Sequence, residues 1–149
     1  MDRAHRLGQS RTVNVYRLKV MLETGAEPIF LPLLRGEYDD MHQAVLDHVA
    51  AYGCPDGLFC WNDEAAIGAN RAFADLGLRV PEDVAVIGSD GIRETAYCVP
   101  TLSTMAQPFE EMCRLAWELL QRRLKEPSLP PQHVLLPMRL EKRASTSRA

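Results

Sequence analysis

The stretch FCWNDEAAIGANRAFADLGLRVPEDVAVIGSDG, from Phe59 to Gly91, contains the pattern that decides the fold. It begins with a short apolar run, passes through a polar corner into a helical repeat of apolar residues, and ends in a second apolar run. A strand, a helix and a strand at this spacing predict two parallel strands joined by a right-handed crossover. Polar residues follow both strands. They are either helix caps and turn residues, or part of a site for a polar ligand.

The same alternation of helix and strand extends outward from this stretch. The predicted helices cover 13–23, 38–52 and 64–76, and a long helix begins near Pro108. The predicted buried strands cover 28–34, 57–61 and 84–89, followed by an extended piece over 102–108 and a more alternating, edge-like strand over 133–143. The long helix has an apolar face made of Met112, Leu115, Ala116, Leu119 and Leu120. This order predicts an α/β fold with three layers around a mostly parallel sheet.

The composition is that of an ordinary globular protein. The chain has 149 residues, 46% of them hydrophobic and 25% charged, with a formal net charge of −3. This length suits about one domain, and the charge offers no broad basic surface for nucleic acid. No apolar run is long enough to span a membrane, and the first residues do not resemble a signal peptide. We therefore expect a cytoplasmic protein without a membrane partner.

Cysteine and histidine spacing does not predict a metal site. Cys54, Cys60, Cys98 and Cys113 lie far apart and form no CxxC pair, and no two histidines have the HExxH spacing. We interpret the cysteines as reduced thiols, mostly small core residues. We expect neither a bound metal nor a cofactor.

Polar corners follow three of the predicted strands. These corners contain Gly36-Glu37-Tyr38, Asn62-Asp63 and Ser89-Asp90-Gly91. In an open parallel sheet the carboxyl ends of the strands share one edge, which is where ligands bind. Each residue alone is explained as well by a cap or a turn. Together, Asn62, Asp63 and Asp90 with the Tyr38 ring favour a site for a small polar ligand.

Catalytic motifs are absent from the sequence. It contains no GxSxG, no phosphate-binding glycine loop and no GxGxxG. The neighbouring carboxylates Asp39 and Asp40 stand at a helix start, where the macrodipole favours acids. The sequence therefore predicts no catalytic residue, and we expect a binding protein rather than an enzyme.

The motif order resembles that of one known family. NDEAAIG is followed by LGLRVPED, by VIGSD, by TLSTMAQP and by HVLLPMRLEKRAS. From about residue 11 to 145 the chain resembles the effector-binding domain of the lactose/galactose repressor (LacI/GalR) family. The resemblance implies the carboxyl-terminal part of a periplasmic-binding-protein-like fold of type I. Residues 1–149 would then form a partial effector-binding domain, with 1–10 and 146–149 as flexible ends.

The resemblance also implies partners and site residues. Members of this family are dimeric transcription factors that sense sugars or purines. By their positions, Tyr38 would stack on the effector, Asn62 and Asp90 would hydrogen-bond it, and Arg11 would reach it from the first helix. The implied dimer interface contains Ala66, Ala69, Phe73, Tyr97 and Cys98.

The chain departs from the family pattern in four ways. Ser89 replaces a usual aromatic residue and Gly91 a common Asp or Asn. By this resemblance we expect the chain to lack the helix-turn-helix headpiece and most of the amino-terminal subdomain, so operator DNA would be bound only through a headpiece absent from this chain. Two alternatives stay open: a fragment of a transport-type sugar-binding protein, and a truncated half-fold that only self-associates.

Overall fold

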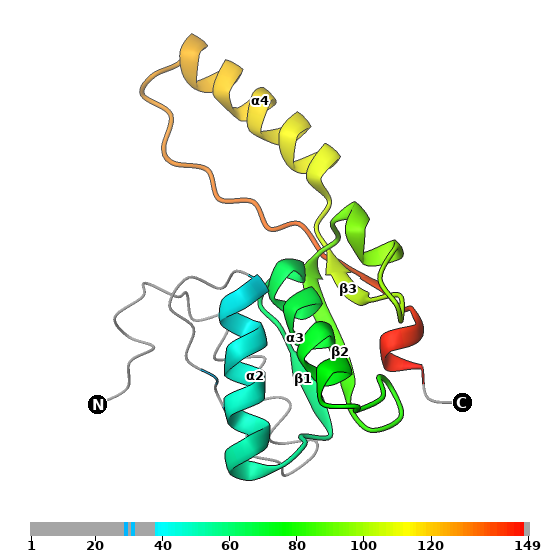
Figure 1. The fold of residues 1–149 in the computed structure, drawn as a ribbon. Helices are drawn as coiled ribbons and strands as arrows, with labels where there is room; N and C mark the ends of the chain where they lie inside the picture. Colours follow the sequence, from blue (N-terminus) through cyan, green and yellow to red (C-terminus); the bar gives the residue numbers. More distant parts are fainter. Residues whose placement is uncertain (1–28, 30, 32–37, 148–149) are drawn as a thin grey trace, which may run out of the picture. The chain divides into compact units, whose positions relative to one another are not determined.

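The structure is a computed structural model that describes residues 29, 31 and 38–147 of the chain. In chain order these residues form α2 (Tyr38–Tyr52), β1 (Gly57–Phe59), α3 (Asp63–Asp75), β2 (Ala85–Asp90), the 3₁₀ helix η2 (Arg93–Ala96), β3 (Ser103–Ala106), α4 (Phe109–Lys125), β4 (Arg139–Glu141) and the 3₁₀ helix η3 (Ala144–Thr146) (Figure 1). The predicted helix over 13–23 lies outside the described residues. Of the strand predicted over 28–34, only Ile29 and Leu31 are described, and neither lies in a strand.

The four described strands form one sheet in the order β1-β2-β3-β4. The first three are parallel, and β4 runs antiparallel to β3. Asp90 at the end of β2 pairs with Ala106 at the end of β3, so these two strands finish at the same edge. This confirms the predicted mostly parallel α/β architecture.

Helix α3 has the predicted start and stop signals. Asn62 is the N-cap, and its Oδ1 accepts a hydrogen bond of 2.8 Å from the Ala65 amide. At the other end, Gly77 has a φ of +71°. Its amide donates to the Ala74 carbonyl, and the Leu78 amide donates to the Phe73 carbonyl. This is a Schellman motif, which satisfies the last carbonyls of the helix.

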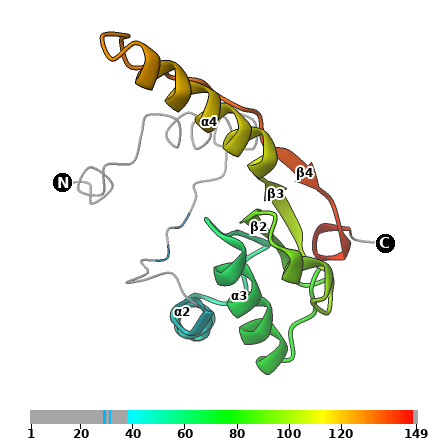
Figure 2. The ribbon, with the colours of Figure 1, turned by 90° about the horizontal axis from the view of Figure 1, so that it is seen from above.

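Helices α2 and α3 lie on the same side of the sheet (Figure 2). Two glycines let the backbones approach closely. A Cβ at Gly68 would overlap the Tyr38 carbonyl at the start of α2, and a Cβ at Gly88 would overlap the Asp63 side chain and crowd Ala66. The apolar core residues with no exposed surface are Cys60, Ala65, Ala66, Ala69, Ala72, Phe73, Val84, Val86 and Leu102. The core therefore lies between α3, its neighbour α2 and the central strand β2.

Two predicted strands are shorter or more exposed than expected. β1 ends at Phe59 instead of Trp61, and Phe59 is 64% exposed although a buried strand was predicted. β1 is the outer strand of the described sheet, so only its β2 side is paired. The strand predicted over 133–143 forms only over Arg139–Glu141. The preceding Pro137 has no amide proton to donate to a ladder.

Helix α4 forms where it was predicted, but none of its 17 residues is buried. The predicted apolar face is therefore largely open to solvent, since Met112 and Leu120 are 38% and 48% exposed. The helix extends away from the described sheet (Figure 1). Neither α4 nor any other described helix is long and apolar enough to cross a membrane.

The cysteines differ from the expectation of a mostly core role. Cys60 is buried, whereas Cys54 and Cys113 are exposed and Cys98 is half-buried, and all four are free thiols. Burial raises the pKa of the Cys60 thiol to about 12, so this thiol stays protonated and unreactive at neutral pH.

The end of the described chain is docked on the sheet. The Ser145 hydroxyl donates to the Val86 carbonyl at 2.6 Å, and Thr146 Oγ1 lies 2.7 Å from the Ser103 hydroxyl. The flexible end predicted from residue 146 therefore does not include Thr146.

Gly88→Ala tests the close approach of α3 to β2. The added methyl group must displace the Asp63 carboxylate or the Ala66 side chain, both of which are fully buried. We expect the free energy of unfolding to fall by about 1–3 kcal/mol, the usual cost of overpacking. Gly57→Ala in β1 is the control, because its Cβ would make only an ordinary contact of 3.5 Å with Ala85. Equal losses in the two variants, measured by denaturant unfolding, would contradict this explanation.

Candidate functional site

The carboxyl ends of β1, β2 and β3 meet at one corner of the sheet. The sequence predicted a shared edge for the ends of the 57–61 and 84–89 strands, whereas the end of β3 was not among its three polar corners. The corner is built from Asn62 and Asp63 after β1, Asp90 and Gly91 at the end of β2, and Gln107 after β3. The Gln107 amide donates to the Asp90 carbonyl at 3.0 Å, which extends the pairing of β2 and β3 beyond the strands. Residues from three separate segments are therefore brought within hydrogen-bonding range of one another.

Asp63 is the buried centre of this corner. Its carboxylate has no exposed surface and accepts three hydrogen bonds from other segments. Oδ2 accepts from the amides of Gly91 and Ile92 at 2.7 and 2.8 Å, and Oδ1 accepts from the Thr104 hydroxyl at 2.6 Å. A fully buried carboxylate cannot contact a ligand. The prediction of a direct ligand contact is therefore wrong for Asp63, which instead connects the start of α3 to the ends of β2 and β3.

Asp90 is the partly exposed carboxylate of the corner. Gln107 Nε2 donates to its Oδ1 at 2.5 Å. Burial is the main cause that raises the pKa of the Asp90 carboxyl above its ordinary value, and the hydrogen bond from Gln107 offsets part of this effect. The nearby Asp63 carboxylate also raises the pKa. Asp90 is thus a partly desolvated hydrogen-bond acceptor whose direction is set by Gln107.

The backbone at Asp90 is strained. Its φ is +124°, the only positive value for a non-glycine residue in the described part of the chain. Such conformations cost about 1–3 kcal/mol and are concentrated at functional sites. The next residue, Gly91, has a φ of +81°, and a Cβ there would overlap Ala106. This tight turn aims the Asp90 side chain at the edge of the sheet.

Gln107 was missed by the sequence analysis. The available signal was positional, since Gln107 directly follows the third parallel strand just as Asp90 ends the second. Asn62 also lies at this edge, but its Oδ1 caps α3, as one of the two interpretations proposed. The predicted Arg11 lies outside the described residues.

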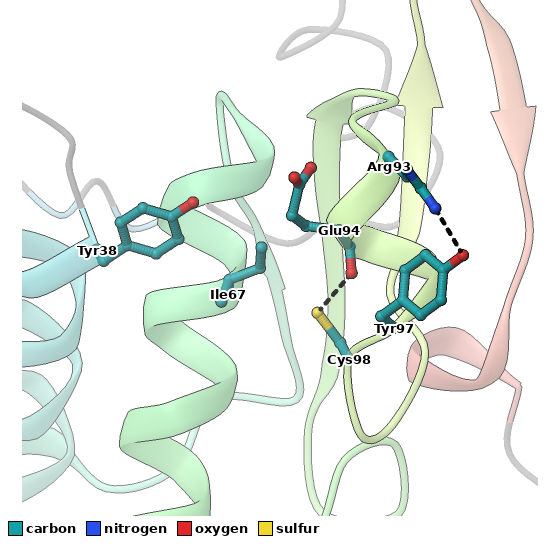
Figure 3. A pocket seen from close by; sticks show the side chains of 6 residues that line it. All are labelled: Tyr38, Ile67, Arg93, Glu94, Tyr97 and Cys98. Carbon is teal, nitrogen blue, oxygen red and sulfur yellow. Dashed lines mark hydrogen bonds between the residues drawn. The ribbon is translucent and has the colours of Figure 1, made fainter.

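Tyr38 lies in a different group of side chains. It lines a shallow hollow of about 550 Å³ together with Ile67, Arg93, Glu94, Tyr97 and Cys98 (Figure 3), and neither Asn62 nor Asp90 lines this hollow. Burial raises the pKa of the Tyr38 phenol above its ordinary value, and negative charge on Glu64 and Glu94 raises it further. The Tyr38 ring, at the start of α2, therefore lies near the acidic side chains of Glu64 and Glu94.

The predicted interface residues fall into two classes. Ala66, Ala69 and Phe73 have no exposed surface within the single chain, because they pack into its core. A partner chain cannot contact them, so the prediction of an interface role is wrong for these three. Tyr97, by contrast, is 71% exposed, and Cys98 is half-buried with its thiol donating to the Glu94 carbonyl at 3.3 Å.

The polar side chains of this corner are hydrogen-bonding groups. Among the described residues, no group of His, Cys, Asp and Glu side chains could hold a metal ion. The polar atoms of the corner are instead a carboxylate and carboxamides, which exchange hydrogen bonds with hydroxyl and amide groups.

Comparison with known proteins identifies the family. A family model for a periplasmic binding protein-like domain matches residues 18–146. The ribose operon repressor of Escherichia coli (strain K12) is 36% identical over 110 residues, covering 74% of this chain and 32% of the repressor. The HTH-type transcriptional repressor MelR of Bacillus subtilis is 37% identical over 142 residues, covering 93% and 41%. The chain belongs to the LacI/GalR family.

A solved structure of this family has the same fold. It is a LacI family transcriptional regulator from Arthrobacter sp. FB24 in complex with lactose, which is 33% identical and superposes with a TM-score of 0.79 over 87% of this chain and 48% of the other. The likeness confirms the predicted periplasmic-binding-protein-like fold. The chain spans less than half the length of these LacI/GalR relatives, so it corresponds to part of their effector-binding region.

Asp63→Asn tests the buried centre of the corner. The substitution removes the negative charge and places an NH₂ group against donors, so at least one of the three hydrogen bonds is lost. We expect the free energy of unfolding to fall by about 3 kcal/mol, since hydrogen bonds to buried charged groups contribute about 1.5–3 kcal/mol each. Asp39→Asn, at an exposed position in the first turn of α2, should change it by at most about 0.5 kcal/mol. Equal losses, measured by thermal or denaturant unfolding, would contradict the assigned role.

Proposed function

We propose that this chain is the effector-sensing part of a LacI/GalR-type transcriptional regulator and binds a sugar or a related small polar molecule at the Asp90–Gln107 corner. The observation that carries the proposal is the partly exposed Asp90 carboxylate, hydrogen-bonded to Gln107 at the carboxyl edge of three parallel strands. This edge is where open α/β sheets bind their ligands. The lactose complex of the Arthrobacter regulator supports a sugar as the class of effector.

The corner suits the hydroxyl groups of a sugar. Asp90 offers carboxylate oxygens that accept hydrogen bonds from hydroxyls, and charge-assisted bonds of this kind are the stronger ones. Gln107 Oε1 makes no hydrogen bond within the described part of the chain and is a second acceptor. The Tyr38 ring lines the separate hollow that contains Tyr97. Its stacking on a sugar or purine ring, like the donor role of Arg11, stays a prediction from the sequence.

The proposed mechanism is a shift between arrangements of two subdomains. The effector would favour the arrangement that it can contact on both sides, and the regulator would transmit this change to a DNA-binding headpiece. The described corner provides one wall of such a cleft. The curated relatives are repressors, which favours a cytoplasmic regulator without catalytic activity over a transport-type binding protein.

We also propose that a second copy of the chain binds over the hollow that contains Tyr97. Tyr97 is 71% exposed and Val99 is 96% exposed, which is unusual for neighbouring large apolar residues. The Arg93 guanidinium lies 5.6 Å from the centre of the Tyr97 ring and holds this ring in place. Aromatic and arginine side chains are enriched at protein interfaces.

Asp90→Ala tests the effector site. Removal of the carboxylate should weaken effector binding by about tenfold or more and leave operator binding intact in a regulator that also carries the headpiece. The measurement is calorimetric titration with a panel of pentoses, hexoses, disaccharides and purines. Asp47→Ala, which removes an exposed carboxylate from α2, should bind as the parent does. An Asp90→Ala variant with unchanged affinity would rule out this corner as the site.

Tyr97→Ser tests the self-association surface. Loss of the exposed ring should raise the dissociation constant of the oligomer by about tenfold, as measured by sedimentation equilibrium. The control is Tyr52→Ser, because Tyr52 is 82% exposed at the end of α2 and does not line the hollow. If both variants associate as the parent does, the surface lies elsewhere.

A further inference from the structure

The turn from Gly91 to Tyr97 carries both proposed surfaces. Asp90, at the effector corner, directly precedes it, and Tyr97, on the proposed self-association surface, ends it. The Asp63 carboxylate holds the beginning of this turn through the amides of Gly91 and Ile92. The rest of the turn is held from another part of the chain.

Arg143 holds the second half of this turn. Its Nη1 donates to the Thr95 hydroxyl at 2.9 Å and to the Leu102 carbonyl at 2.7 Å. Thr95 is fully buried, and its hydroxyl donates in turn to the Ile92 carbonyl at 2.6 Å. Ile92 is the residue whose amide binds Asp63. A continuous series of hydrogen bonds therefore runs from Arg143 through Thr95 and Ile92 to Asp63.

The position of Arg143 is itself fixed. Its backbone amide donates to the Ser103 hydroxyl at 2.8 Å, and its Nη2 pairs with Glu141 of β4. The Arg143 side chain is only 23% exposed. The planar guanidinium directs several N–H groups in fixed directions, so a residue anchored in this way determines where its acceptors lie.

We propose that Arg143 is a positioning residue that holds the 91–97 turn in one conformation, and thereby sets the geometry of Asp90 and of the Tyr97 surface. The proposal rests on the proposed function only where it names these two surfaces as an effector site and a self-association surface. The positioning itself is a property of the chain. β4 and Arg143 follow the 126–138 connection from α4, so a displacement of that connection would reach both surfaces through Arg143.

Hydrogen exchange of individual amides tests the positioning. In Arg143→Gln, the amides of Gly91, Ile92 and Leu102 should exchange at least about tenfold faster, because the hydrogen bonds that hold the turn are weakened. The Cys60 and Leu78 amides, which donate to Ile87 and Phe73 outside the turn, should change much less. A uniform increase at all these amides would show a loss of global stability only. That outcome, or no increase at the turn, would overturn the proposal.

Two further variants make the result specific. Arg139→Gln is the matched control, because Arg139 pairs with the same Glu141 but is 80% exposed. It should leave the exchange of the turn unchanged, and an equal effect would overturn the proposal.

Thr95→Val replaces only the hydroxyl that links Arg143 to Ile92, and it serves also if Arg143→Gln does not fold. It should speed exchange at the same amides, and an unchanged turn would overturn the proposal. No effector is present in these experiments, so their outcome is independent of whether Asp90 binds a sugar.

Discussion

The buried carboxylate of Asp63 is the interaction on which the rest of the described structure depends. Burial of a charge is costly unless hydrogen bonds compensate for it, and here two amides and one hydroxyl do so. These donors come from the turn after β2 and from β3, so the charge can be satisfied only when α3 and both strands are in their native places. Gly88 belongs to the same constraint, because any side chain there would occupy the space of the carboxylate.

This constraint explains which parts of the fold could be predicted from the sequence. The bounds of α2 and the ends of α3 follow from local sequence signals. These are the apolar spacing, the Asn62 cap and a glycine at position 77, which adopts a positive φ. Asp63 was interpreted as a ligand contact because its burial is not visible in the local sequence. The carboxylate is buried in the space left by Gly88, which lies 25 positions later in the chain. The length of β4 was also overestimated, because alternation extends over the whole 133–143 segment whereas pairing with β3 begins only at Arg139, after Pro137.

The helical periodicity of apolar residues identifies the apolar face of a helix but not the segment that packs against it. Ala66, Ala69 and Phe73 were assigned to an interface between copies, whereas α2 and β2 of the same chain cover them. The apolar face of α4 is, by contrast, uncovered in the described part of the chain. The solved LacI/GalR relative is about twice as long as this chain. An apolar helix face in a part of a larger fold therefore indicates burial in the whole protein rather than in the part.

The corner combines structural residues with the residue that is proposed to bind the effector. Asn62, Asp63 and Gly88 form the scaffold, and this scaffold holds Asp90 in a backbone conformation that a free chain would avoid. The side chain that is proposed to bind a ligand, Asp90, is thus the one whose conformation the scaffold imposes. Because the same turn then leads to Tyr97, a substitution that relaxes it would alter both proposed surfaces together. A change in effector preference that spares assembly is therefore more accessible at a side chain outside both the turn and the hollow, such as Gln107.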